Sequence, residues 1–264
     1  MTSAVILAAG EGQRLRPYTQ GTPKCLVLFN GRPLIAYQIE ALKSAGIKEI
    51  AIVTGFEHHQ LEAYGDIRIW NQDFSETNMV ASLMEARNFL ESCDDVVVAY
   101  GDILYETRII ESLLKSDAQI AVTVDRGWRS LWEARMTDPL SDAETLKING
   151  ESILTEIGHK PSSYEDVQAQ YMGLIKMRKQ GIREMTATWD SFTDQTRFMG
   201  RSAKMMYMTD LLEALIVSGE QIHAVPIEHG WLEVDTVKDL EQYEAMIKAK
   251  SLGRLFNLPD SESK

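Results

Sequence analysis

Residues 7–26 read LAAGEGQRLRPYTQGTPKCL, and a short apolar run over residues 4–7 leads into them. Such a run is typical of a buried strand that ends in a turn. Gly10 and Gly12 let the backbone bend tightly and approach a bulky ligand without a Cβ in the way. Successive main-chain N–H groups in such a bend form a concavity that suits phosphate oxygens. Three cations follow in the same stretch, at Arg14, Arg16 and Lys24. The stretch therefore predicts a phosphate site after the first strand.

Two common phosphate motifs do not fit this stretch. A P-loop requires Gly-Lys-Ser/Thr, and here Lys24 follows Pro23. The dinucleotide fingerprint requires a third small residue, and Leu15 occupies that place. Instead, a Leu-x-Pro-x-Thr string and the Pro-Lys pair follow the glycines in order. The whole string resembles the N-terminal motif of the nucleotidyltransferases that activate sugar phosphates and phosphocholine.

Composition excludes several classes of function. The 264 residues are 44% hydrophobic and 25% charged, as in ordinary globular proteins. A net charge of −12 argues against nucleic acid or an anionic membrane as a partner. The two cysteines, Cys25 and Cys93, imply no disulfide framework. We find no signal peptide pattern and no apolar run of about 18 residues, and we expect a soluble cytoplasmic protein.

Strand and helix patterns alternate along most of the chain. Strands are expected over residues 4–7, 26–29, 50–53, 67–70, 95–100 and 120–124, and helices over 34–45, 79–90, 205–217 and 237–249. This alternation predicts an α/β fold: a Rossmann-like mixed, mainly parallel sheet flanked by helices. Residues 127–132 read as an irregular aromatic loop, and residues 146–157 as a hairpin around Asn149-Gly150. We expect one nucleotidyltransferase domain over 1–250, with a small β-rich substrate lobe at about 125–180 and a tail over 251–264.

The polar loop over residues 71–78 is expected at the same sheet edge as the opening loop. Asn78 and Ser82 lie one helical turn apart, so they share a face. Asn78 could serve only as a helix cap. The string Asn-Met-x-x-Ser-Leu resembles the phosphocholine-activating branch of the family, whereas sugar-activating members carry a Pro- and Gly-rich segment here. The resemblance therefore implies nucleotide contacts for both residues.

Asp102 follows an apolar strand at the edge where open α/β sheets bind ligands. By resemblance, Asp102 and Asp235 are the metal-binding aspartates, with Mg²⁺ as cofactor. Two carboxylates suit Mg²⁺, which keeps several waters and needs few protein oxygens. Glu233 stands two residues before Asp235 and would share its strand face, so whether it joins the metal site stays open.

The remaining site residues follow from the motif and the resemblance. The nucleotide site comprises Leu7, Ala8, Ala9, Gly10, Glu11, Gly12, Asn78, Ser82, Tyr100 and Gly101. Lys24 and Arg14 are implied as catalytic contacts to the nucleotide phosphates. Lys160 is either a contact to the acceptor phosphate or a solvated surface lysine. The acceptor side comprises Trp128, Trp132, Tyr171, Gly173 and Trp231, whose aromatic rings either form a cage for a quaternary ammonium or only pack.

The resemblance implies Mg²⁺-dependent transfer of a cytidylyl group from CTP to a phosphorylated small alcohol, amine or amino acid, with release of pyrophosphate. One alternative is a sugar-1-phosphate nucleotidyltransferase that uses UTP, dTTP or GTP. Another is a non-catalytic nucleotide-sensing protein, which would be expected to have lost a phosphate-binding lysine or a metal carboxylate. Residues 252–258 are apolar enough to bury against a neighbour, so a homo-oligomer stays open.

Overall fold

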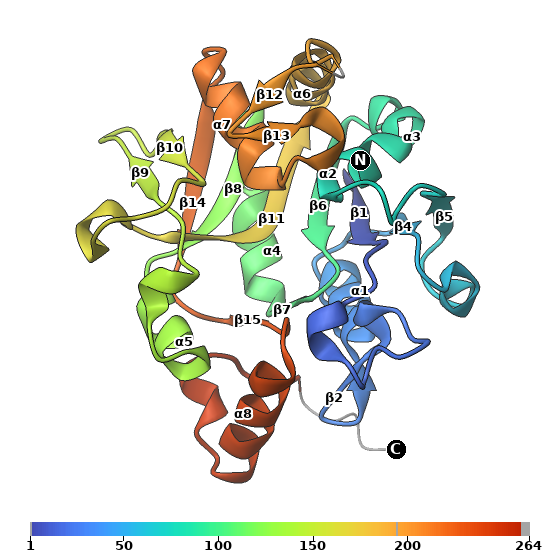
Figure 1. The fold of residues 1–264 in the computed structure, drawn as a ribbon, viewed down its shortest axis with the longest axis vertical. Coiled ribbons are helices and arrows are strands. Elements are labelled where there is room, and N and C mark those ends of the chain that lie inside the picture. The colour runs from blue at the N-terminus through green and yellow to red at the C-terminus, as the bar shows by residue number, and fades with distance from the viewer. Residues whose placement is uncertain (1, 194, 260–264) are drawn as a thin grey trace.

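The computed structural model describes residues 2–193 and 195–259. Within these residues the centre is a sheet of seven strands in the order β14-β8-β11-β6-β1-β4-β5 (Figure 1). Its strands are β1 (Thr2–Ala8), β4 (Ile50–Thr54), β5 (Ile67–Trp70), β6 (Asp95–Tyr100), β8 (Ile120–Asp125), β11 (Gln170–Arg178) and β14 (Ile222–Ile227). Strand β11 runs antiparallel to both of its neighbours, and the other pairs in the sheet are parallel. The predicted mainly parallel α/β sheet is confirmed.

The register of β1 and β6 determines where the site forms. The two strands are parallel, and Leu7 lies opposite Tyr100. Both strands end within two residues of this pair, so the opening loop and the Gly101-Asp102 turn leave the sheet side by side. This is the carboxyl edge, where open α/β sheets bind ligands.

Helices cover both faces of the sheet. Since successive strand residues point to opposite faces, Ala4 and Ile6 of β1 lie in one core cluster and Val5 and Leu7 in the other. The first cluster includes residues of α1 (Leu34–Ser44), α4 (Thr107–Leu114), α5 (Trp128–Arg135) and α8 (Val237–Lys248). The second includes residues of α2 (Met79–Glu85), α3 (Arg87–Ser92), α6 (Lys179–Asp190) and α7 (Met208–Val217).

Short strand pairs decorate this layered core. They are β2 (Leu28–Phe29) with β3 (Arg32–Pro33), β9 (Leu146–Ile148) with β10 (Leu154–Ile157), β12 (Arg197–Phe198) with β13 (Arg201–Ser202), and β15 (Trp231–Glu233) with β7 (Ile103–Tyr105). Single 3₁₀ turns occur at Gln13–Leu15, Lys24–Leu26, His58–Leu61, Pro139–Ser141, Tyr164–Asp166, Ala203–Met205 and Leu252–Arg254. The hairpin predicted around Asn149-Gly150 is confirmed, with Ile148 opposite Leu154.

Three local predictions were wrong. Residues 127–132 do not form an irregular loop, because α5 begins at Trp128 and buries Trp128, Leu131, Trp132 and Arg135 at helical spacing. The expected helix over 79–90 is divided into α2 and α3, which meet at Ala86. The substrate lobe does not extend to residue 180, because β11 lies between β8 and β6 in the central sheet.

The segment after α8 packs on its own chain. Leu252, Leu255 and Phe256 are buried in the first core cluster, so the apolar residues offered for an oligomer contact are largely used within the chain. The end of the predicted tail, residues 260–264, lies outside the described residues. Over the residues that are described, none of the helices has the length and apolar character needed to span a bilayer. The cytoplasmic location and the oligomeric state stay predictions.

Candidate functional site

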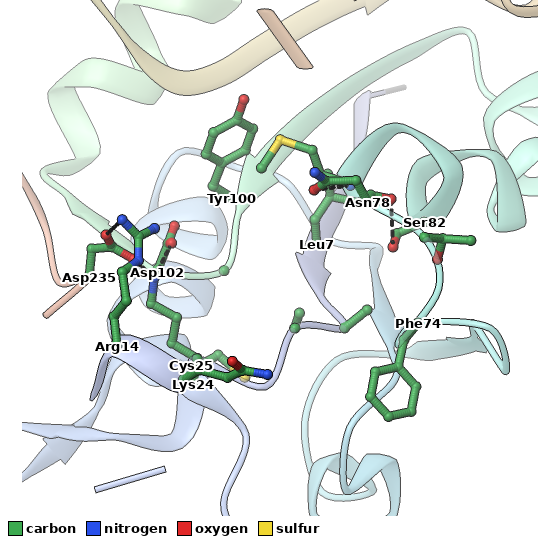
Figure 2. Close-up of a pocket in the computed structure, with 18 residues that line it drawn as sticks. Leu7, Arg14, Lys24, Cys25, Phe74, Asn78, Ser82, Tyr100, Asp102 and Asp235 are labelled. Atoms are coloured by element: carbon green, nitrogen blue, oxygen red, sulfur yellow. Dashed lines mark hydrogen bonds and ion pairs between the residues drawn. The ribbon is translucent and has the colours of Figure 1, made fainter. Parts of the chain in front are cut away.

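A pocket with a volume of about 400 Å³ opens at the carboxyl ends of β1 and β6. Figure 2 shows its side chains converging from the opening loop, the start of α2, the end of β6 and the segment after β15. It is lined by Leu7, Ala8, Ala9, Gly10, Gly12, Gln13, Arg14, Lys24, Cys25, Phe74, Thr77, Asn78, Met79, Ser82, Tyr100, Gly101, Asp102 and Asp235. Most of the residues predicted for the nucleotide and metal are therefore brought together in one cavity.

The opening loop is shaped by Gly12. Its φ of +64° lies in the left-handed region, which residues other than glycine rarely adopt. A Cβ at this position would lie only 2.8 Å from the Cβ of Lys24. Thr19 holds the loop by donating its hydroxyl to the carbonyl of Gly12 at 2.8 Å. These contacts place Lys24 directly behind the glycine bend.

Two cations and two carboxylates meet at one side of the pocket (Figure 2). The Nζ of Lys24 lies 2.5 Å from Oδ2 of Asp102 and 2.6 Å from Oδ1 of Asp235. Arg14 Nη1 lies 2.7 Å from Oδ2 of Asp235. Burial by itself would lower the pKa of Lys24, but attraction to the two carboxylates outweighs burial and raises that pKa above its ordinary value.

The carboxylate pair fits a divalent metal ion. Oδ1 of Asp102 is buried and has no hydrogen-bond partner among the described residues, and an unpartnered buried carboxylate oxygen is costly unless a cation or donor meets it. Over the same residues, no group of three His, Cys, Asp or Glu side chains could hold a metal. Two carboxylates alone suit only an ion that takes its other ligands from water and phosphate.

Glu233, left open above, is directed elsewhere. Its carboxylate pairs with Arg135, which is buried, and it does not line the pocket. Burial, together with the charges of Asp102 and Asp235, raises the pKa of Glu233, although Arg135 opposes the shift. The side chain therefore serves as a partner for Arg135, beside the carboxylate pair.

Asn78 both caps α2 and lines the pocket. Its Oδ1 accepts a hydrogen bond from Met79 N at 2.8 Å, and its Nδ2 donates to Met205 O at 3.4 Å. Ser82 also lines the pocket, and its hydroxyl accepts a hydrogen bond from Nδ2 of Asn71 at 3.0 Å. Asn78 can therefore cap α2 and face the pocket at the same time.

Sequence reasoning missed five lining residues. They are Gln13, Cys25, Phe74, Thr77 and Met79. Phe74 and Thr77 belong to the polar loop that was expected at this edge, so the position of that loop was the available signal. Conversely, Glu11 was expected at the nucleotide but does not line the pocket; its carboxylate accepts hydrogen bonds from Gln13 and Arg16.

The predicted acceptor tryptophans do not lie in loops around the pocket. Trp128, Trp132 and Trp231 are 4%, 4% and 2% exposed, and their rings pack with centroids 5.8 and 6.0 Å apart. The indole nitrogens are satisfied by carboxylates, since Nε1 of Trp132 donates to Asp142 at 3.0 Å and Nε1 of Trp231 donates to Asp125 at 2.9 Å. Their size and apolar area account for this burial.

The other acceptor-side predictions have mixed positions. Tyr100 lines the pocket, and the ring of Tyr171 packs edge-on against it with centroids 5.7 Å apart. Gly173 has a φ of +90°, and a Cβ there would lie 2.8 Å from the Tyr100 ring. Lys160 is exposed and donates from Nζ to the carbonyls of Leu140 and Ser141 at 2.6 and 2.7 Å. Tyr171 and Gly173 thus pack against the Tyr100 ring and do not line the pocket themselves. Lys160 does not line the pocket either.

Comparisons with known proteins agree with this geometry. The chain matches a family model described as a MobA-like NTP transferase domain over residues 4–166. It is 38% identical to the CTP:phosphoglutamine cytidylyltransferase of Campylobacter jejuni over 248 residues, which are 90% of this chain and 98% of that protein. It is also 38% identical to the choline-phosphate cytidylyltransferase of Streptococcus pneumoniae, but over 117 residues that are 43% of this chain and 50% of that protein.

Solved structures are similar in fold. The inositol-1-phosphate CTP transferase from T. maritima superposes with a TM-score of 0.72 over 97% of this chain and 98% of that chain, at 18% identity. The CTP:phosphocholine cytidylyltransferase from Streptococcus pneumoniae superposes with a TM-score of 0.69 over 93% and 99%, at 22% identity. At these identities the similarity concerns the fold.

Proposed function

The chain belongs to the family of MobA-like NTP transferase domains, and we propose that it transfers the cytidylyl group of CTP to a phosphorylated amino acid or a closely related amide. The broader statement stands on the relatives: the chain is a nucleotidyltransferase similar to cytidylyltransferases that act on phosphorylated small molecules. The cavity of about 400 Å³ is within the range of pockets that hold small molecules.

One observation carries the proposal. Two cations and two carboxylates from three distant parts of the chain meet within hydrogen-bond distance beside the opening loop. They are Lys24, Arg14, Asp102 and Asp235. A structural ion-pair network would not require an open cavity beside it, nor a carboxylate oxygen without a partner. The combination of cations for phosphate and carboxylates for a metal is what transfer of a nucleotidyl group requires.

In the proposed reaction, different residues of the chain bind the triphosphate and offset its charge. The opening loop receives the triphosphate of CTP, and Lys24 and Arg14 offset its negative charge. An ionised oxygen of the acceptor phosphate forms a bond to the α-phosphorus of CTP, the bond from that phosphorus to the bridging oxygen breaks, and pyrophosphate leaves. A phosphate monoester has a second pKa near 6, so it is largely ionised at neutral pH and no protein base is needed. The site acts by bringing two anions together.

Asp102 and Asp235 would hold Mg²⁺. The buried, unpartnered Oδ1 of Asp102 and the meeting of Asp102 with Asp235 around Lys24 support this role. When bound there, Mg²⁺ supplies charge neutralisation at the phosphates that undergo transfer.

The acceptor class is the finer part of the proposal. The relative that acts on phosphoglutamine, according to its name, is similar to this chain over nearly its whole length, whereas the choline-phosphate relative matches less than half of this chain. A quaternary ammonium favours an aromatic cage, and three of the four aromatic residues considered for one are buried against each other. Both observations favour a phosphorylated amino acid over phosphocholine.

Pyrophosphate release by the purified chain with Mg²⁺ tests the proposal. Each of the four common NTPs is paired with phosphoglutamine, phosphocholine, phosphoethanolamine, aminoethylphosphonate and hexose-1-phosphates. We expect turnover with CTP and a phosphorylated amino acid, and none from the Asp102→Asn variant. Turnover only with a hexose-1-phosphate would establish the sugar alternative. Nucleotide binding without turnover on any acceptor would favour the sensing protein.

A further inference from the structure

Asp235 lies in the short turn between β15 and α8, and this turn is held by one side chain. Oδ2 of Asp239 accepts the backbone N–H of Asp235 at 3.1 Å and that of Thr236 at 2.8 Å. The hydroxyl of Thr236 in turn accepts the backbone N–H of Asp239 at 3.1 Å, which completes a capping box at the start of α8. The backbone that carries Asp235 is thereby fixed to the first turn of the helix.

Asp239 is itself bound by Arg135. Nε of Arg135 donates to Oδ1 of Asp239 at 3.0 Å, and Nη2 donates to Oδ2 at 3.3 Å. Arg135 is only 3% exposed and Asp239 only 2%. Burial would raise the pKa of Asp239, but the hydrogen bonds and charge of Arg135 hold it below its ordinary value. The two-point contact fixes the orientation of the carboxylate as well as its charge.

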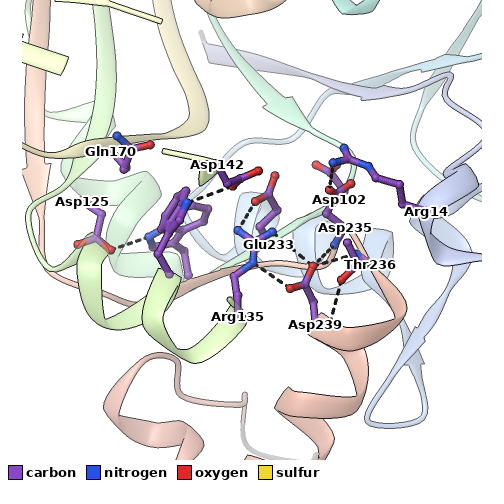
Figure 3. Close-up of polar contacts among 12 residues, drawn as sticks. Arg14, Asp102, Asp125, Arg135, Asp142, Gln170, Glu233, Asp235, Thr236 and Asp239 are labelled. Carbon is purple, nitrogen blue, oxygen red and sulfur yellow. Dashed lines mark hydrogen bonds and ion pairs between the residues drawn. The ribbon is translucent and has the colours of Figure 1, made fainter. Parts of the chain in front are cut away.

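The same guanidinium also reaches the other side of the turn. Nη1 of Arg135 pairs with Glu233, two residues before Asp235. Arg135 therefore contacts the chain on both sides of Asp235, and it comes from α5, whose apolar residues pack in the first core cluster. Figure 3 shows the row from Arg135 through Asp239 to Asp235 and Arg14.

We propose that Arg135 and Asp239 are positioning residues that hold the Asp235 carboxylate in place for a divalent metal ion. This role depends on the proposed function, since it takes Asp102 and Asp235 as the metal ligands. Three carboxylates within seven residues would repel one another at this turn, and Arg135 offsets two of them while leaving Asp235 free to face the pocket. Groups that orient metal ligands in this way commonly change metal affinity by about 10–100-fold when they are replaced.

Mn²⁺ binding to the full chain tests the proposal without turnover. Mn²⁺ is titrated into each protein, and the free ion is followed by electron paramagnetic resonance. Asp239→Asn keeps a side-chain oxygen for the two backbone N–H groups but loses the charge that faces Arg135. We expect its Mn²⁺ dissociation constant to rise about 10-fold or more. Arg135→Lys keeps the charge but loses the planar fork, so its constant is expected between those of the wild type and Asp239→Asn.

The chain offers a matched control in Asp210. This residue caps α7 by accepting the backbone N–H of Tyr207 at 2.7 Å and pairs with Arg201 at 2.9 Å, but it does not line the pocket. Asp210→Asn should lower the melting temperature by an amount similar to Asp239→Asn while leaving the Mn²⁺ constant within about twofold of the wild type. An Asp239→Asn protein with lowered stability and wild-type Mn²⁺ affinity would reduce Arg135 and Asp239 to a structural cap and overturn the proposal.

Asp235→Asn separates this inference from the proposed function. If Asp235→Asn binds Mn²⁺ as the wild type does, the metal role of Asp235 fails, and the inference fails with it. If Asp235→Asn binds Mn²⁺ weakly while Asp239→Asn binds it as the wild type does, only the positioning role of Arg135 and Asp239 fails. Should Asp239→Asn not fold, a folded Arg135→Lys protein carries the test. Weaker Mn²⁺ binding by this variant would support the positioning role, and unchanged binding would overturn it.

Discussion

The Nζ of Lys24 donates a hydrogen bond to Oδ2 of Asp102 at 2.5 Å, and the same ammonium reaches Asp235 at 2.6 Å. The residue proposed to bind phosphate thus contacts both residues proposed to bind metal. An ammonium and a divalent cation are attracted by the negative charge of the same two carboxylates and repel each other, so their interactions with the pair compete. Binding of metal and nucleotide together would resolve this competition, because the phosphates offer Lys24 a new partner.

Replacement of Lys24 by Met should separate the two roles. Loss of a cation that meets the transferred phosphates should lower kcat for pyrophosphate release by about 10²–10³-fold. Mn²⁺ binding in the absence of nucleotide should instead become tighter, because the two carboxylates lose their competing ammonium. Lys48→Met, at an exposed position, serves as the control and should leave both measurements unchanged. Weaker Mn²⁺ binding by Lys24→Met would contradict the competition.

Two glycines of the pocket should respond differently to alanine. A Cβ at Gly101 would lie 2.5 Å from the carbonyl oxygen of Leu7, so the ends of β1 and β6 would have to separate. We expect Gly101→Ala to lose about 1–3 kcal/mol of unfolding free energy, in the range of overpacked cores, and most of its activity. Gly10 has open space around its Cβ position, so Gly10→Ala should keep its melting temperature and raise only the KM for CTP.

Thermal unfolding and steady-state kinetics on the two variants check this contrast. Gly150→Ala is the control, since Gly150 lies in the distant hairpin turn with open space around it. Equal losses of stability in Gly10→Ala and Gly101→Ala would show that the close approach at Gly101 does not govern the packing of the strand ends.

Much of this site was predictable because its parts are local. The strand before the opening loop, the glycine bend and the position of Asp102 after β6 each follow from apolar runs and turn residues within a few positions. The edge of the sheet then brings them together, because parallel strands place their carboxyl ends side by side. The pairing of Asp235 with Lys24 is different: no local pattern specifies a partner 211 residues away, and only the family resemblance pointed to Asp235.

Two of the wrong predictions share a physical cause. Residues 127–132 contain two tryptophans and two polar residues, and the apolar stripe of Trp128, Leu131 and Trp132 spans little more than one helical turn until the buried Arg135 extends it. Arginine is seldom buried without a partner, and its partners, Glu233 and Asp239, lie about a hundred residues later. Strand β11 was likewise assigned to the lobe because its pairing with β6 and β8 is non-local.

The cap and the nucleotide role of Asn78 can be tested apart. Asn78→Asp keeps the side-chain oxygen that accepts Met79 N, so the cap of α2 and the melting temperature should be retained. The variant places a negative charge in the cavity that is proposed to hold CTP, and we expect the KM for CTP to rise about tenfold or more, as a charge repulsion of about 1.4 kcal/mol would produce. Steady-state kinetics with varied CTP measure the change.

Asp73→Asn, in the loop before α2 but outside the pocket lining, is the control for this measurement. An unchanged KM in Asn78→Asp would leave Asn78 as a cap alone.

Glu144 should make stability depend on pH near neutrality. Burial, together with the charges of Asp142 and Asp210, raises the pKa of Glu144 to about 7, against the opposing hydrogen bond from Thr209 and the charge of Arg201. A carboxyl group whose pKa is raised in the folded state contributes its full stability below the unfolded pKa of about 4.5 and loses it as the pH rises through the folded pKa. Above pH 7 the folded chain therefore carries an unfavourable buried charge.

Glu144→Gln removes this titration while retaining an oxygen for the Thr209 hydroxyl, which lies 3.4 Å from the Glu144 carboxylate. The variant should match the wild type near pH 4.5, gain on it between pH 4.5 and 7, and exceed it by up to about 3 kcal/mol at pH 8. Denaturant unfolding of both proteins at a series of pH values measures the difference. Glu151→Gln, at an exposed position, should show a difference that does not vary over the same range. Since the difference requires an ionised and buried carboxylate in the folded wild type, a Glu144→Gln protein that is no more stable than the wild type at pH 8 would show that Glu144 reaches solvent when it ionises.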